Sequence, residues 1–199
     1  MSEPTTIQAG AAVSMLGITA VQAGATPAEG SDDVYRMIMG NPAETGQGQP
    51  LPANLTPEEY ANLKTFDEAD FEVFSNQRWE RFAESHAPDV RVHWPDGHYT
   101  DGLDQHIEDS KVLFVWAPDL KVVSHPLRVA KNNLVSVIGS FTGTFSEPMP
   151  DGNGGFIPPT GKSFAVNMLT VGVFNRQGTM QEEFVFWDQH SFSQQIGLA

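Results

Sequence analysis

The chain has 199 residues, of which 40% are hydrophobic, and this is enough for one globular domain with a core. Its formal net charge is -14 and it has 11 Lys and Arg, which argues against nucleic acid as a partner, because proteins that follow a phosphate backbone cluster basic residues. The absence of cysteine excludes disulfides, thiolate catalysis and cysteine-based metal centres.

Residues 1–55 contain few large apolar side chains and many Gly, Ala, Pro and Gln, so they bury little surface on their own. We interpret them as an extension, either poorly packed or docked on a partner, before a domain over 56–199, with a short helix predicted over 32–39. The stretch 11–21 faintly resembles a signal-peptide core, but no Lys or Arg precedes it. A cytoplasmic protein is expected, with export as the alternative. No apolar run reaches the roughly 18–20 residues of a membrane-spanning helix, so no membrane partner is expected.

The first half of the domain is predicted to be mainly helical. The sequence Thr56-Pro57-Glu58-Glu59 is a capping box and predicts the start of a helix. Apolar residues recur at intervals of three to four over 67–85 and 102–116, which predicts two further helices. Between them, 90–94 is typical of a strand.

Beyond residue 119 the apolar pattern changes to a period of two, which is typical of strands. Four long segments rich in β-branched and aromatic residues are separated by turn sequences. They span residues 120–129, 134–145, 163–174 and 179–190. Helices followed by a run of strands predict an α+β domain in which a curved sheet wraps around helices.

The last predicted strand places one carboxylate among aromatic side chains. Alternate residues of a strand share a face, so Asp188 is expected beside Phe184 and Phe186. An apolar neighbourhood raises the pKa of a carboxyl group toward the range that is useful for proton transfer near neutral pH. Asp188 is therefore a candidate general acid or base. The alternative is an aspartate at a strand end that caps a turn or faces water.

Three histidines of one segment are candidate metal ligands. His93, His98 and His106 lie near Asp104, but their spacing is not a recognised ligand pattern, and no metal is predicted. The helical pattern places His106 on the same side as apolar residues, so it is predicted to point toward the sheet and partner a buried acid. A core histidine with satisfied hydrogen bonds is the alternative.

Aromatic and methionine side chains of the strands are candidates for the wall of a hydrophobic ligand cavity, although such residues also make ordinary cores. Asn167 is an amide inside an apolar strand, where it either binds a ligand carbonyl or satisfies a backbone group. The predicted substrate-binding residues are Asn167, Trp94, Phe141, Phe164, Met168, Phe184 and Phe186.

Short stretches in order over about residues 67–198 resemble the SnoaL-like polyketide (ester) cyclases of the nuclear transport factor two-like superfamily. They are Pro95-Asp96-Gly97, Gly102-Leu103, Gly143-Thr144-Phe145, Pro158-Pro159-Thr160-Gly161-Lys162, 178–183, Trp187-Asp188 and Gln195-Ile196-Gly197. The resemblance implies a cone-shaped α+β barrel, in which a curved antiparallel sheet wraps around helices and an apolar cavity. It also implies chemistry without a cofactor, a homodimer, and a general acid/base role for Asp188 in an intramolecular aldol closure.

The sequence departs from the family pattern at the expected supporting histidine. None occurs in 165–174, so His106 or His125 would have to replace it, and Glu182-Glu183-Phe184 stands where many relatives have Glu-His-Trp. We predict a cofactor-independent cyclase, or a related isomerase or lyase, acting on a hydrophobic carbonyl compound. The alternatives are a non-catalytic binding module of the same fold, or a hydrolase or dehydratase on it.

Overall fold

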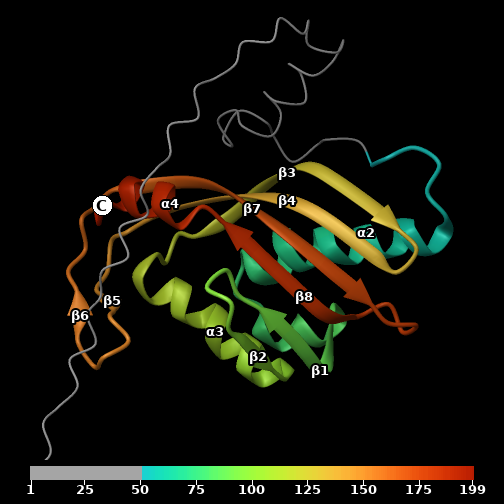
Figure 1. Ribbon diagram of the computed structural model, residues 1–199, viewed down its shortest axis with the longest axis horizontal. Coiled ribbons are helices and arrows are strands. Elements are labelled where there is room, and N and C mark those ends of the chain that lie inside the picture. Colours follow the sequence, from blue (N-terminus) through green and yellow to red (C-terminus); the bar gives the residue numbers. More distant parts are fainter. Residues whose placement is uncertain (1–50) are drawn as a thin grey trace, which may run out of the picture.

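The computed structural model describes residues 51–199 of the chain (Figure 1). The helix predicted over 32–39 and the signal-like stretch 11–21 lie outside the described residues. Within 51–199, no helix is both long enough and apolar enough to cross a membrane.

The capping box starts helix α2 (Pro57–Glu68) as predicted, because Thr56 accepts the backbone N–H of Glu59 while the Glu59 side chain accepts that of Thr56. The helix predicted over 67–85 is not continuous. Helix α2 runs into a π-helical turn, η2 (Ala69–Phe74), and after a break the chain forms a short 3-10 helix, η3 (Trp79–Glu84).

Side-chain hydrogen bonds explain this break. The Asn76 amide donates to the carbonyls of Phe71 and Glu72, and the Ser75 hydroxyl donates to the carbonyl of Asp70. These donors end the helical ladder, since they take carbonyls that a continuing helix would use. Gln77 then turns the chain with a positive φ of 54°.

Seven further strands and helices follow, and the long ones occur in the predicted order. They are β1 (His86–His93), β2 (Tyr99–Asp101), α3 (Leu103–Trp116), β3 (Lys121–Lys131), β4 (Leu134–Thr144), β7 (Ser163–Phe174) and β8 (Met180–Trp187). A small hairpin of β5 (Met149–Pro150) and β6 (Phe156–Ile157) projects at one end of the molecule (Figure 1).

The main sheet has the strand order β2-β1-β8-β7-β4-β3 and curves around the helices, which confirms the predicted α+β class (Figure 1). All its pairings are antiparallel except that of β1 with β8, which is parallel. The pairing of β4 with β7 is in unbroken register over eleven residue pairs, from Leu134 with Val173 to Thr144 with Ser163. This long regular pair of strands forms a wall against which the core packs.

The end of the chain differs from the prediction. Strand β8 stops at Trp187, and 189–196 forms a helix, α4 (Gln189–Ile196), instead of continuing the strand. Asp188 is the N-cap of α4, and its Oδ1 accepts the backbone N–H groups of His190 and Ser191. An aspartate in this position satisfies N–H groups that have no partner within the helix.

The two faces of β8 are also opposite to the sequence prediction. Glu183 and Val185 are buried against the helices, whereas Phe186, on the other face, is 49% exposed. From Glu182 to Trp187 the odd-numbered residues of β8 therefore face the core and the even-numbered residues, including Phe184, face outward, whereas before the register shift it is Met180 that is buried.

Candidate active site

An apolar cavity lies between the inner face of the sheet and the helices. Its wall includes Phe74, Trp94, Trp116, Phe141, Phe164, Met168 and Trp187. Four ionisable side chains interrupt this apolar surface, namely Asp70, His86, His106 and Glu183. Such convergence of a few polar groups in an apolar hollow is typical of small-molecule sites.

Glu183 is the centre of this polar cluster. It comes from the inner face of β8, while His86 begins β1 and His106 lies on α3. Glu183 Oε2 is 3.4 Å from His106 Nε2 and 3.7 Å from His86 Nε2. Both separations indicate electrostatic contact without a close hydrogen bond. Within the described residues, Glu183 Oε2 is a buried atom without a hydrogen-bond partner.

The His86 ring is oriented by its own segment. Its Nδ1 lies 2.8 Å from the Ser85 hydroxyl, which in turn donates to the carbonyl of Phe82. The Ser85 oxygen can therefore accept a proton that His86 carries on Nδ1, and Nε2 is directed toward Glu183 Oε2, 3.7 Å away.

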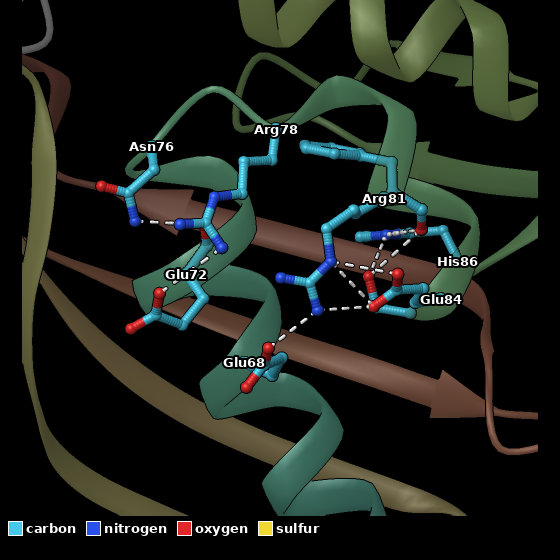
Figure 2. A network of polar contacts seen from close by, with 9 residues as sticks. Glu68, Glu72, Asn76, Arg78, Arg81, Glu84 and His86 are labelled. Atoms are coloured by element: carbon cyan, nitrogen blue, oxygen red, sulfur yellow. Dashed lines mark hydrogen bonds and ion pairs between the residues drawn. The ribbon is translucent and has the colours of Figure 1, made fainter.

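Arg81 links the short helix η3, which precedes His86, to helix α2. Figure 2 shows its guanidinium between Glu84, on the same turn, and Glu68 of α2, with N–O distances of 2.7 and 2.8 Å. These contacts tie η3 to α2.

The charges in the cluster follow from burial and proximity. Burial opposes the ionisation of Glu183, but His86 and His106 outweigh it and hold the pKa of Glu183 below its ordinary value. Burial lowers the pKa of His106 to about 4, although Glu183 acts in the opposite direction. At neutral pH the carboxylate is ionised and His106 is neutral.

A second buried network supports Asp70 at the cavity wall. His125 lies between two carboxylates, with Nδ1 2.8 Å from Asp67 Oδ1 and Nε2 2.8 Å from Asp70 Oδ2. Arg128 donates to the other oxygen of Asp67 at 2.7 Å. Burial raises the pKa of Asp70 even though the hydrogen bond from His125 opposes this effect. Of the two histidines that could replace the missing supporting histidine, His106 therefore faces the cavity, whereas His125 is held behind Asp70.

Sequence comparison shows the family to which the chain belongs. The profile described as SnoaL-like polyketide cyclase matches residues 65–196, which includes every ionisable residue of the cavity. The chain belongs to the SnoaL-like polyketide cyclase family. No curated protein is similar enough in sequence to match it.

Solved structures of SnoaL-like and related proteins share the fold. A protein of Jannaschia sp. CCS1, assigned as a SnoaL-like polyketide cyclase, is 23% identical, with a TM-score of 0.63 over 76% of this chain and 99% of that chain. IdmH of Streptomyces antibioticus, assigned as a polyketide cyclase, is 23% identical, with a TM-score of 0.59 over 68% and 98%. A protein of Acidithiobacillus ferrooxidans with the same assignment is 22% identical, with a TM-score of 0.58 over 75% and 99%. At these identities the likeness concerns the fold.

The predicted acid/base of this SnoaL-like chain lies outside the cavity. Asp188 is exposed at the start of α4 and is absent from the cavity wall. Its Oδ2 accepts the hydroxyl of Ser191 at 2.7 Å, and these hydrogen bonds lower its pKa. The prediction that Asp188 faces an apolar cavity is therefore wrong, because the strand ends one residue earlier and the carboxylate caps a helix.

The other predicted site residues divide between the two faces of the sheet. His106, Trp94, Phe141, Phe164 and Met168 line the cavity. Phe184 and Phe186 lie on the outer face of β8, where Phe184 stacks on His93. Asn167 pairs with Ser140 of β4 and accepts its hydroxyl at 2.9 Å, which leaves it outside the cavity wall.

Sequence reasoning did not identify Glu183, His86 or Asp70 as site residues. For Glu183 a signal existed, since the alternation Glu183, Val185, Trp187 is as regular as the alternation that includes Phe184 and Phe186. The larger aromatic side chains suggested the wrong inner face. His86 and Asp70 carried no recognisable pattern, because their approach to Glu183 depends on the π-helical turn and on the parallel β1–β8 pairing.

Proposed function

We propose that this SnoaL-like protein is a cofactor-independent cyclase of the intramolecular aldol type, or a related isomerase or lyase, acting on a hydrophobic carbonyl compound. One observation carries the proposal: an ionised carboxylate, Glu183, is buried at an apolar cavity between two histidines without a hydrogen-bond partner for its Oε2 in the described residues. Because Glu183 is ionised at neutral pH and lies at the apolar cavity, it can accept a substrate proton as a general base.

Glu183 is assigned as the general base. It removes the proton α to a substrate carbonyl, and the enolate carbon attacks a second carbonyl of the same molecule. The new carbon–carbon bond leaves an alkoxide, which takes the proton back from Glu183. The reaction is therefore a net isomerisation that needs no external oxidant or reductant.

The two histidines are assigned to the developing negative charge. Neutral His106 can donate from Nε2 to the enolate oxygen, because its pKa of about 4 leaves the ring uncharged at neutral pH. His86 is held by Ser85 with its Nε2 toward the cavity, where it can accept a proton from Glu183 or return one. The apolar wall excludes water and strengthens each of these interactions.

Proton exchange at carbon tests the proposal without knowledge of the natural substrate. In D2O the protein is expected to accelerate the replacement of α-hydrogens of apolar methyl ketones and 1,3-diketones by deuterium, followed by mass spectrometry. Glu183→Gln keeps the shape of the side chain but removes the base, and loss of a general base is expected to slow exchange by about 10²–10⁴-fold.

Two matched variants make the result specific. Glu182→Gln makes the same change on the outer face of the same strand and should retain exchange. Asp188→Asn should also retain it, because the carboxylate that it removes faces solvent at the start of α4. Loss of exchange in Asp188→Asn together with retention in Glu183→Gln would return the role to Asp188. Ketone binding without exchange in the wild type would support a non-catalytic binding module instead.

A further inference from the structure

We propose that His86, His106 and Glu183 form a site for one divalent transition-metal ion of the zinc class. Metal binding here does not depend on the reaction proposed above. Its consequence for activity rests on that proposed function, because the same three groups would supply the proton transfer.

The distances between the three groups fit ligands of a common ion. Glu183 Oε2 lies 3.4 Å from His106 Nε2 and 3.7 Å from His86 Nε2, and all three ligand atoms lie within 4.8 Å of one another. Two ligands bound to the same tetrahedral Zn²⁺ at about 2.0–2.1 Å are about 3.3–3.4 Å apart. The two separations from Glu183 are long for hydrogen bonds and close to the edges of such a tetrahedron, and the two histidines lie within 4.8 Å of each other.

Unpartnered atoms point into the same space. Glu183 is 8% exposed, and its Oε2 has no hydrogen-bond partner in the part of the chain that the structure describes. His86 Nε2 lies 3.7 Å from this oxygen, and a proton or a cation between the two atoms stabilises both. A metal ion satisfies both atoms at once.

The orientation of His86 is typical of a metal ligand. A ligating histidine usually donates its other ring N–H to an oxygen, which fixes the tautomer. His86 Nδ1 has this partner in the Ser85 hydroxyl, 2.8 Å away. His106 Nδ1 is buried without a partner in residues 51–199, so no hydrogen bond prevents that ring from presenting its Nε2 lone pair.

The donor set selects the kind of ion. Two imidazoles and one carboxylate suit Zn²⁺, Co²⁺, Ni²⁺ and related ions, whereas Ca²⁺ and Mg²⁺ require mainly oxygen ligands. Three protein ligands leave a fourth position open, and the apolar cavity lies next to it. A bound ion would occupy the base Glu183, so we expect added Zn²⁺ to inhibit α-hydrogen exchange.

The decisive experiment uses Co²⁺ as a spectroscopic probe in the tag-free, chelator-treated full chain, without substrate. We expect one Co²⁺ per chain, with visible absorption bands of a four-coordinate site that disappear when one equivalent of Zn²⁺ is added. Changes in groups that only orient metal ligands weaken binding by about 10–100-fold, so loss of the ligand in Glu183→Gln should weaken it by more than about 100-fold. Glu182→Gln should bind as the wild type does.

A second ligand variant keeps the test valid if Glu183→Gln is unstable. His106→Gln removes a different ligand from α3 and should also abolish the cobalt bands, with folding checked by circular dichroism. Failure of the wild type to bind Co²⁺, or retention of the bands in both ligand variants, would overturn the proposal. The outcome is independent of the acid/base assignment, because exchange is measured on the metal-free protein.

Discussion

Asp67 is the centre of a buried network of ion pairs behind the cavity. Its two oxygens contact His125 Nδ1 at 2.8 Å and Arg128 Nη1 at 2.7 Å, and both partner side chains are buried. Removing one member of a buried ion pair leaves an uncompensated charge, which costs about 3–5 kcal/mol. We therefore expect Asp67→Asn to lower the free energy of unfolding by about 3 kcal/mol, measured by urea denaturation followed by tryptophan fluorescence.

A surface pair provides the comparison for Asp67. Glu84 contacts Arg81 at 2.7 Å, but its side chain is 55% exposed. Exposed ion pairs contribute about 0–1 kcal/mol, so Glu84→Gln should have a small effect. If the two variants were equally stable, the buried network would not have the energetic role assigned to it here.

Individual site residues could be predicted from the sequence only where the pattern of a single helix or strand determines which way the side chain points. His106 follows from the apolar stripe of its helix, and the structure places it in the cavity opposite a buried acid. The sequence favours Asp188 over Glu183 as the carboxylate at the cavity, because period two defines two faces of a strand without saying which one is buried. Only the packing of β8 against the helices decides between them.

Among the elements, helix α2 is joined to the β3–β4 turn by Glu59. One oxygen of this side chain accepts the backbone N–H of Thr56 and the other accepts that of Asn132, both at 2.9 Å. The Lys131 ammonium lies 3.5 Å from Oε1. The two backbone hydrogen bonds and Lys131 lower the pKa of Glu59 from 4.5 to about 2.

This shift predicts a pH dependence with a definite sign. A carboxyl group whose pKa is lower in the folded state stabilises the fold above its unfolded pKa, and this contribution is lost as pH falls through the folded pKa. Wild-type stability should therefore fall between about pH 5 and pH 2 more steeply than that of Glu59→Gln. Urea midpoints at several pH values measure the difference. Glu58→Gln, an exposed neighbour in the same turn, is the control, and parallel profiles for wild type and Glu59→Gln would contradict the prediction.

Element prediction succeeded where local signals agreed with packing. The capping box marks the start of α2, and the four long strands begin within a residue or so of their predicted positions. The π-helical turn and α4 could not be predicted. The first depends on Ser75 and Asn76 taking backbone carbonyls, and the second on Asp188 acting as a cap rather than as a strand residue.

At the scale of the whole molecule, the outer face of the sheet carries a row of apolar side chains. One ladder row runs across four strands through Leu127, Ile138, Leu169 and Phe186, which are Cα partners in sequence. Leu169 is 36% exposed and Phe186 is 49% exposed. In Figure 1, helix α2 lies behind the sheet, so its packing leaves the opposite face of β7 and β8 uncovered by that helix.

We expect this face to join two copies of the chain. A contiguous apolar row on a sheet is costly to expose to water, and a second copy offers the same row for self-complementary packing. A stable interface needs about 800 Å² from each partner, an area that a face of four long strands can supply. The SnoaL-like resemblance also implies a homodimer.

Charge introduced into the apolar row should separate the two copies. The double variant Leu169→Asp with Phe186→Asp places two carboxylates opposite each other in one ladder position, and again opposite those of the partner, without touching the cavity. Light scattering after size-exclusion chromatography should give a dimer mass for the wild type and a monomer mass for the double variant. Val112→Asp with Val115→Asp changes two equally exposed valines on α3 and should leave the dimer intact. A monomeric wild type, or a double variant that remains dimeric, would show that the outer face of the sheet is not the interface.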